Sequence, residues 1–376
     1  MPQSGIREIV ALASKVPDCI RLDLGEPNFP TPQHICDAAY EAANGGFTKY
    51  TLPVGLLSLR ESIAVKLKRV NGMDVLPSNI VATSGATSAI FNACIAILEH
   101  GDEMLMPDPG WPNWEMMILA SGGKVVRYEA PAHHGFLPDP DRMDHLVTPR
   151  TKGIILNTPS NPTGAVMPEE LVRRMVEFAR RHDLWVISDE CYDEFVFDGS
   201  HVSAGTFDID GRVISVFSCS KTYAMTGWRV GYAVVPDAAR EVMAKLQQPV
   251  IGSICSIAQK AAEAAFNGPQ DCVAEMRAFY RARRNQAQTF LRQAGMKTWS
   301  PEGAFFAMID ISQASTDTYA FARAMVLQHK VSVAPGETFG PAGKGLIRVS
   351  LATSEDNLEL GLERIVGAIR LNSKAV

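Results

Sequence analysis

The chain has 376 residues, of which 46% are hydrophobic and 20% charged, and its formal net charge at pH 7 is −5. This length is enough for a sizeable core and for two or three domains. The slightly acidic balance, without a long basic run, argues against a nucleic-acid partner. Seven scattered cysteines include no CxxC pair, which argues against a disulfide framework or a zinc site.

Residues 1–7 lack the charged and then apolar pattern of a signal peptide. No apolar stretch approaches the length needed to cross a membrane. With unpaired cysteines, these features predict a cytoplasmic protein with no membrane partner and no metal site.

The N-terminal part alternates short helical patterns with loops rich in glycine and proline. The predicted elements are a helix at 6–15, a strand at 20–24, and helices at 33–43 and 56–69. In the first loop, the backbone of Gly25 can let a ligand approach closely. A later loop at 49–55 carries the isolated Tyr50.

From residue 80 onward, short apolar runs alternate with helical patterns. The expected strands are 80–83, 102–106, 124–129, 153–157, 184–188, 213–217 and 230–235, with helices ending near 98 and at 169–182 and 237–247. This alternation predicts an α/β fold with a mostly parallel sheet flanked by helices.

A long polar helix at 271–294 is suited to bridge two domains, and the rest of the chain reads as a smaller α+β unit. Its predicted elements are a strand at 303–309, a helix at 317–329, a strand at 346–351 and a helix at 355–370. We expect residues 44–284 to form the large ligand-binding domain. Residues 1–43 and 285–376 are expected to form the small domain.

The stretch after the apolar run 213–217 combines Ser218, Ser220 and Lys221, and Arg229 follows eight positions later. A lysine just beyond a buried strand is partly desolvated, which lowers its pKa and frees the amine as a nucleophile. Schiff-base chemistry with a carbonyl cofactor needs such an amine. The serines and Arg229 indicate an anion, most simply a phosphate. The alternative is a turn with a solvated lysine and arginine.

Chemically active side chains follow several of the predicted strands, where ligands of parallel sheets bind. They are Asn161, Asp189, Tyr192 and Lys221. Gly85, Ala86 and Thr87 precede a helix, a natural anion site that is weak evidence alone, because hydroxyl residues there are ordinary caps.

Two tryptophans, Trp111 and Trp114, lie in a proline-rich loop and are more often core residues than cofactor-stacking ones. Arg348 interrupts the apolar strand at 346–350. It either lies exposed on an edge strand or points at a buried anion, and we favour the anion.

Six motifs occur in a fixed order: SGATSAI, PDPGWPNW, NTPSNPTG, ISDECY, SCSKTYAMTGWRVGY and IRVSLA. From Asp23 to Ala352, the chain therefore resembles the fold-type I, pyridoxal-phosphate-dependent aminotransferases of class I/II, the aspartate aminotransferase family. The resemblance implies a large domain that binds pyridoxal 5'-phosphate (PLP), a smaller domain, and a homodimer with shared active sites.

The resemblance also implies roles for individual residues. Lys221 would be the internal aldimine lysine and later the base of the proton shift. Asp189 would pair with the pyridine nitrogen, so that the ring acts as an electron sink. Tyr192 and Asn161 would hydrogen-bond the phenolic oxygen of the ring, and Trp111 would stack on it and border the substrate.

The remaining implied roles concern the two anionic groups. The phosphate would be held by Gly85, Ala86, Thr87, Ser218, Ser220, Arg229 and Tyr50 of the neighbouring subunit. Arg348, with Asn161 and the Gly25 backbone, would bind the substrate α-carboxylate, since a guanidinium can bind it through two hydrogen bonds.

The implied reaction is a ping-pong transfer of an amino group from an L-amino acid to a 2-oxo acid, with 2-oxoglutarate as the expected acceptor. Some family members bind a distal carboxylate with an arginine of the partner subunit, but residues 247–252 contain none. Another subgroup uses a lysine where this chain has Thr87. Arg7 is a candidate for binding such a distal carboxylate, although we favour the interpretation that Arg7 is a solvated surface residue. The donor stays open between aspartate and an aromatic or aliphatic amino acid.

The main alternative on the same fold is a C–S lyase or another elimination or decarboxylation, because the cofactor carries the electronics and the pocket selects the bond. A non-catalytic effector-sensing domain is disfavoured by the lack of an appended DNA-binding segment. A nicotinamide enzyme or an NTPase is disfavoured because no GxGxxG follows a strand and no P-loop is complete.

Overall fold

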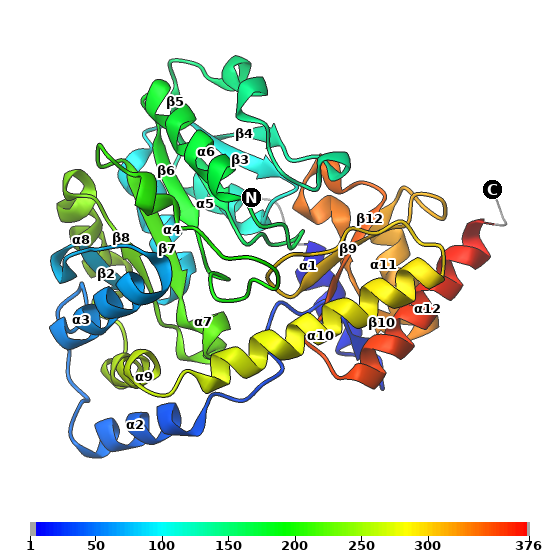
Figure 1. Ribbon diagram of the computed structural model, residues 1–376, viewed down its shortest axis with the longest axis horizontal. Helices are drawn as coiled ribbons and strands as arrows, with labels where there is room; N and C mark the ends of the chain where they lie inside the picture. Colours follow the sequence, from blue (N-terminus) through cyan, green and yellow to red (C-terminus); the bar gives the residue numbers. More distant parts are fainter. Residues whose placement is uncertain (1–4, 374–376) are drawn as a thin grey trace.

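The computed structural model describes residues 5–373, and its largest element is a seven-stranded sheet (Figure 1). The strand order is β2-β8-β7-β6-β5-β3-β4. The strands are β2 (Ile80–Thr83), β3 (Glu103–Asp108), β4 (Lys124–Glu129), β5 (Thr151–Asn157), β6 (Trp185–Asp189), β7 (Val213–Ser218) and β8 (Gly231–Val234). β8 is antiparallel to both of its neighbours and the other pairs are parallel. The predicted α/β fold with a mostly parallel sheet is confirmed.

Helices cover both faces of this sheet. They are α4 (Gly85–Ile97), α5 (Pro112–Ala120), α6 (Glu169–Arg181) and α8 (Asp237–Ile251). Successive side chains of a strand point to opposite faces, so neighbouring residues enter different cores. Ile155 packs in the cluster with α4, α5 and α8, whereas Ile154 and Leu156 pack in the cluster with α6. Continuous apolar strands are therefore needed here, as in any parallel sheet covered on both faces.

The second part of the fold is built around an antiparallel sheet of order β11-β12-β9. Its strands are β9 (Phe306–Asp310), β11 (Ala334–Pro335) and β12 (Leu346–Ser350), and its helices are α11 (Thr318–His329) and α12 (Glu355–Ser373). The N-terminal segment joins this part, because β1 (Ile20–Arg21) pairs in parallel with β10 (Val331–Ser332) and α1 (Gly5–Ala13) packs against α11.

The long helix α10 (Asp271–Gln293) runs from the region of α7 (Cys219–Thr222) and α9 (Ser256–Asn267) to α12 (Figure 1). Its position agrees with a bridging helix. α9 also packs against α2 (Gln33–Asn44) and α3 (Leu57–Lys66), which continues as a π-helical turn over Leu67–Asn71. The numerical domain boundaries stay a prediction.

Several predicted elements need correction. The strand expected at 303–309 begins only at 306, because Ala304 has a left-handed backbone with φ of 55° and forms a turn. The loop expected to continue through 114 becomes α5 at Pro112, since proline is well suited to the first turn of a helix. The helix expected at 237–247 extends to Ile251, and α9 was not predicted. Within residues 5–373, no helix is long and apolar enough to cross a bilayer.

Candidate active site

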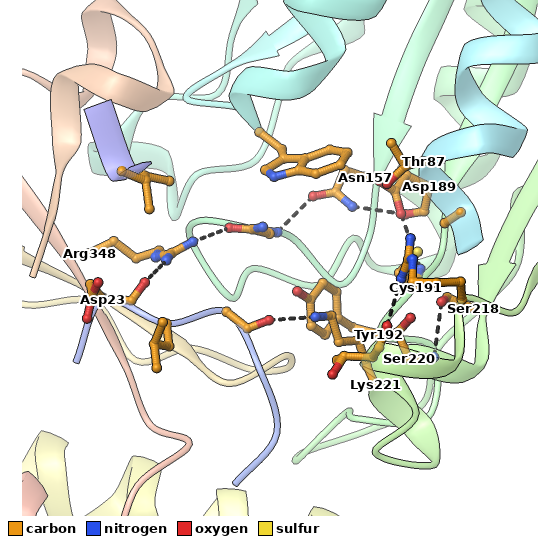
Figure 2. A pocket seen from close by; sticks show the side chains of 18 of the residues that line it. Asp23, Thr87, Asn157, Asp189, Cys191, Tyr192, Ser218, Ser220, Lys221 and Arg348 are labelled. Atoms are coloured by element: carbon orange, nitrogen blue, oxygen red, sulfur yellow. Dashed lines mark hydrogen bonds between the residues drawn. The ribbon is translucent and has the colours of Figure 1, made fainter. Parts of the chain in front are cut away.

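A cavity of about 290 Å³ lies at the carboxyl ends of strands β5, β6 and β7, and residues of α1 and β12 close its other side. Most of the residues singled out from the sequence line it: Gly25, Ala86, Thr87, Trp111, Asn161, Asp189, Tyr192, Ser218, Ser220, Lys221, Arg229 and Arg348. Figure 2 shows Arg348 at one end of the cavity and Thr87 and Asp189 at the other, with Lys221 and Tyr192 along its floor.

One end of the cavity is suited to an anion. The first N–H groups of a helix have no partner within the helix, and Ala86 and Thr87 of the α4 first turn line the cavity there. Arg229 lies beside them and donates from Nη1 to the Thr226 carbonyl at 2.9 Å. Gly85 lies against the guanidinium, because a Cβ at this position would be 2.4 Å from Arg229 Nη2.

Lys221 enters the cavity from the short helix α7, directly after β7. Its Nζ donates to the Gly25 carbonyl at 2.5 Å. Burial lowers the pKa of Lys221 from 10.5 to about 8. About a tenth of the amine is therefore neutral at pH 7, far more than for an ordinary lysine, and the neutral amine is the form that a nucleophile or base requires.

Asp189 and Tyr192 come from the end of β6 and the loop after it, and both are almost fully buried. Asp189 Oδ1 accepts a hydrogen bond from the Cys191 amide at 3.3 Å. Burial raises the pKa of the Asp189 carboxyl and, more strongly, that of the Tyr192 phenol. A cationic partner would remove much of the desolvation cost of an ionised Asp189.

Arg348 lies on β12, the central strand of the three-stranded sheet, and is 2% exposed. The edge-exposed alternative for this arginine is therefore wrong. Its Nη1 donates to Asn161 Oδ1 at 2.9 Å and its Nη2 to the Asp23 carbonyl at 2.7 Å. The guanidinium also lies 4.2 Å from the ring centroid of Phe306. Burial lowers the pKa of Arg348 to about 10, so the side chain stays cationic at neutral pH.

Asn157 is a site residue that the sequence reasoning did not single out. Its Nδ2 donates to the Asp189 carbonyl at 2.9 Å, and its Oδ1 accepts from the Asn161 amide at 2.8 Å. It thus links the strand that ends in Asp189 to the asparagine that contacts Arg348 (Figure 2). Its place as the last residue of an apolar strand, within NTPSNPTG, was the available signal.

Three residues named from the sequence do not reach the cavity lining. Tyr50 is 97% exposed on its loop. Gly85 supports Arg229 from behind. Arg7 is exposed on α1, whose apolar Ile6 and Val10 line the cavity instead. This agrees with the favoured interpretation of Arg7 as a solvated residue.

The cavity contains three cations, Lys221, Arg229 and Arg348. Within residues 5–373, no acidic side chain lies within 4.0 Å of any of them, although 19 contacts of this kind between a lysine or arginine and a carboxylate occur elsewhere. Arg348 is buried, Lys221 is partly buried and Arg229 is exposed, and a buried charge is costly unless it is paired. The pocket is therefore suited to ligands that bring an anionic group to Arg229 and another to Arg348.

These features, on an α/β fold, are suited to a ligand with a phosphate-like anion and a carbonyl group and to a second ligand with a carboxylate. Comparison with known proteins agrees: the chain belongs to the family "Aminotransferase class I and II", which matches residues 17–365. Members of this family depend on PLP, so the chain is a PLP-dependent aminotransferase of fold type I. The anion cradle, the unpaired cations and the buried Asp189 fit that cofactor.

Individual relatives cover nearly the whole chain. It is 39% identical over 350 residues to the aspartate/prephenate aminotransferase of Thermus thermophilus, with 92% of this chain and 90% of the relative covered. It is 36% identical to aromatic-amino-acid aminotransferase 2 of Thermococcus litoralis, covering 96% and 94%. A solved structure of a double mutant of Thermus thermophilus aspartate aminotransferase superposes with a TM-score of 0.93 at 38% identity, covering 98% and 97%. These relatives favour amino-group transfer over the lyase alternative.

Proposed function

We propose that the cavity holds PLP between α4 and Trp111 and binds the amino donor through Arg348. The observation that carries this proposal is the set of three cations without a carboxylate partner. The N–H groups of Ala86 and Thr87, with Ser218, Ser220 and Arg229, would hold the phosphate of PLP. When bound, PLP withdraws electrons from the substrate α-carbon and carries the amino group between the two half-reactions.

The residues around the ring then have distinct tasks. Asp189 would keep the pyridine nitrogen of the bound cofactor protonated, and the buried position of Asp189 would strengthen that ion pair. Tyr192 and Asn161 would donate hydrogen bonds to the phenolic oxygen of the cofactor, and Trp111 would pack against its ring. Lys221 holds the cofactor and accepts the proton of the substrate α-carbon through Nζ, which its lowered pKa allows near neutral pH.

Arg348 binds the substrate α-carboxylate, with Asn161 and the Gly25 backbone at the same end of the cavity. The guanidinium is already oriented by its hydrogen bonds to Asn161 and the Asp23 carbonyl. A preorganised donor loses little side-chain entropy when the carboxylate binds.

We further propose an aromatic or large aliphatic amino acid as the preferred donor. Ile6, Val10 and Leu24 line the same cavity as Arg348, and Trp111 adds an aromatic surface. Among the described lining residues, no cation beyond Lys221, Arg229 and Arg348 remains for a distal carboxylate. Aspartate would thus place a desolvated charge against apolar groups.

The test is the visible absorption of the PLP-loaded protein during addition of single amino acids without an acceptor. We expect phenylalanine, tyrosine or leucine to bleach the band of the bound cofactor, and 2-oxoglutarate to restore it. Their kcat/KM should exceed that of aspartate by about tenfold or more. Aspartate as the best donor would refute the donor proposal alone. Lys221→Ala should lose turnover while its circular dichroism is retained, and an active variant would refute the assignment of Lys221.

We also propose a homodimer with shared active sites. Tyr50 is 97% exposed, and Leu52 beside it is 62% exposed. A hollow of about 770 Å³ on the outer side of Arg229 is lined by Trp228, Ile251, Ile254 and Ile257, among others. Tyr50 of a second copy has the size and polarity to enter it and to meet the phosphate. A cytoplasmic location is part of the same proposal and rests on the unpaired cysteines.

A further inference from the structure

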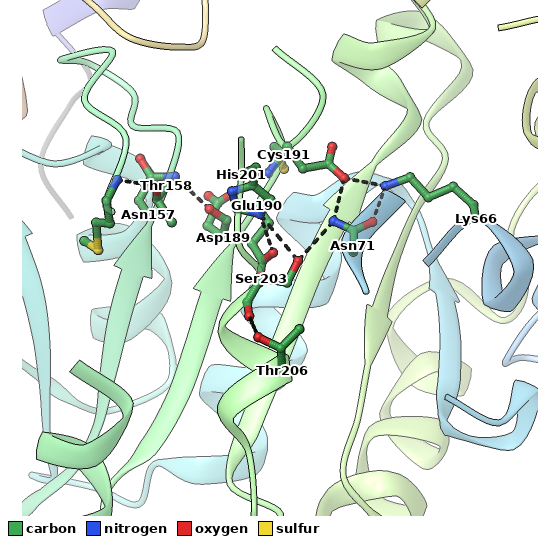
Figure 3. A network of polar contacts seen from close by, with 12 residues as sticks. Lys66, Asn71, Asn157, Thr158, Asp189, Glu190, Cys191, His201, Ser203 and Thr206 are labelled. Atoms are coloured by element: carbon green, nitrogen blue, oxygen red, sulfur yellow. Dashed lines mark hydrogen bonds and ion pairs between the residues drawn. The ribbon is translucent and has the colours of Figure 1, made fainter. Parts of the chain in front are cut away.

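A buried ionic cluster lies outside the cavity, beside the end of β6 (Figure 3). We name Lys66, Asn71, Asp193 and Ser203 the Lys66 cluster. Lys66 Nζ donates to Asp193 Oδ2 and, at 2.8 Å, to Asn71 Oδ1. The side chains of Lys66 and Asp193 are only 3% and 4% exposed. None of these residues has a task in the proposed reaction.

The helix that carries Lys66, α3, ends in an irregular turn at this cluster. In an α-helix, side chains five positions apart point about 140° away from each other. Leu67–Asn71 instead form a π-helical turn, whose hydrogen bonds join residues i and i+5. This turn brings Asn71 and Lys66 to the same side of the helix, where they form their hydrogen bond. π-Turns are uncommon and occur often at functional sites.

The cluster holds the loop that carries Tyr192. Asn71 Nδ2 donates to Asp193 Oδ2 at 3.1 Å and to Ser203 Oγ at 3.0 Å. On the other side of Tyr192 in the sequence, Glu190 Oε2 accepts from His201 Nε2 at 2.7 Å. Tyr192 therefore lies between two residues whose buried carboxylates are anchored, as the labelled side chains in Figure 3 show for Glu190.

The cluster also reaches the strand that leads to Lys221. Lys66 Nζ lies 5.0 Å from the ring centroid of Phe217, the residue before Ser218 at the end of β7. The Lys66 ammonium thus contacts Asp193, the residue after Tyr192, and Phe217, near the end of the strand that precedes Lys221.

Stability alone is a weak reason for such a cluster. A buried ion pair is often no more stabilising than well-packed apolar residues of similar volume, because both charges must be desolvated. What apolar residues cannot supply is a directional contact that fixes the position of the loop backbone.

We propose that Lys66, Asn71 and Asp193 are positioning residues that fix the backbone at 190–194 and thereby the hydroxyl of Tyr192 in the pocket. The link to catalysis rests on the proposed function, in which Tyr192 contacts the cofactor. The proposed effect of the cluster on the position of the loop backbone does not depend on the proposed function.

The first experiment measures backbone amide hydrogen exchange in the full-length, cofactor-free protein. The amides of Asp193 and Phe195 donate to carbonyls within this loop, so they report its opening. Lys66→Met should accelerate their exchange at least tenfold. The matched control is Lys68→Met, because Lys68 lies on the same π-turn but pairs with Asp74 at the exposed surface. Equal exchange in Lys66→Met and the control would overturn the proposal.

The second experiment separates position from stability. The double variant Lys66→Met with Asp193→Leu removes both buried charges, so its thermal midpoint should exceed that of Lys66→Met. Positioning predicts that kcat nevertheless stays at least tenfold below wild type, with donor KM changed less than threefold. Recovery of kcat together with the midpoint would show a merely stabilising cluster and overturn the proposal.

A double-mutant cycle tests the route through Tyr192. Lys66→Met should lower kcat at least tenfold in the wild-type background but less than threefold in the Tyr192→Phe background. The same loss in both backgrounds would overturn this route. If the wild-type protein does not transaminate, the proposed function fails by itself, and the exchange experiment still decides whether the cluster positions the loop.

Discussion

The amine of Lys221 loses its proton closer to neutral pH than an ordinary lysine does. Burial lowers its pKa to about 8, and the Gly25 carbonyl accepts its hydrogen bond. Asp189 shows the opposite effect of the same environment, because burial raises the pKa of its carboxyl. Each residue is thus poised for a partner of opposite chemical character: an electrophilic carbonyl for Lys221 and a cation for Asp189.

The lowered pKa predicts the pH dependence of cofactor capture. Only the neutral amine is nucleophilic, so the second-order rate of PLP binding by the cofactor-free protein should rise with pH and level off above a midpoint near 8. Stopped-flow absorbance over about four pH units, centred near pH 8, measures this rate. A midpoint near the ordinary lysine value would contradict the desolvation argument. Lys221→Ala is the control and should show no covalent capture.

Asp189→Ala removes the proposed partner of the pyridine nitrogen and leaves the phosphate cradle intact. We expect kcat to fall by about 10³-fold, the scale observed when a preorganised electrostatic partner is lost, while PLP stays bound. Single-turnover kinetics with dialysed, cofactor-loaded protein checks both statements. Asp74→Ala, which changes an exposed carboxylate, is the control. Turnover near that of the control would refute the role of Asp189.

At the scale of elements, the start of α4 does most to shape the anion end of the cavity. The helix begins at Gly85 with φ of +74°, and its next residues, Ala86 and Thr87, line the cavity together with Arg229. Residues with a side chain rarely adopt this positive φ, and a Cβ at position 85 would be 2.4 Å from Arg229 Nη2. A side chain here would therefore both strain the turn and displace the guanidinium.

Gly85→Ala should for these reasons weaken PLP affinity and lower the free energy of unfolding of the cofactor-free protein by about 1–3 kcal/mol. Fluorescence titration and urea unfolding measure the two effects. Gly367→Ala is the matched control, because its added Cβ meets nothing within 4 Å and it lies within α12. An unchanged affinity in Gly85→Ala would show that Arg229 does not depend on this glycine.

At the scale of the whole molecule, the site is assembled from parts that lie far apart in the sequence. Lys221 and Asp189 come from the large sheet, Arg348 from the three-stranded sheet, and Ile6 and Val10 from the N-terminal helix. The pairing of β1 with β10 carries the N-terminal segment to the C-terminal part. The substrate end of the cavity thus exists only when both parts are folded and in contact.

In the proposed dimer, Tyr50 of each subunit contributes to the phosphate site of the other. Sedimentation should give twice the monomer mass, and Tyr50→Ala should weaken PLP affinity by about tenfold without changing the fold, as for loss of one hydrogen bond to a charged group. Tyr40→Ala, at another exposed tyrosine, is the control. A monomer with undiminished PLP affinity would contradict the shared site.

The sequence by itself determined the local features of this protein. Apolar strands with reactive residues at their ends predicted the mostly parallel sheet and placed Asn161, Asp189 and Lys221 at one edge, because periodicity and strand ends are local properties. The motifs around Lys221 predicted the family. The proline at the start of α5 is compatible with both a loop and the first turn of a helix. The alanine-rich run of α9 was a local helix signal that the sequence reasoning passed over.

Only the tertiary structure decided what depends on contacts between distant residues. It placed Arg348 on a central strand beside Asn161, 187 positions away, and not on an exposed edge. It brought Asn71 to Asp193 across 122 positions. Burial, and with it the pKa of Lys221, is set by the surrounding chain and not by the residue type. The sequence therefore determined the chemistry available at the strand ends, and the packing of the chain decided which side chains share the cavity.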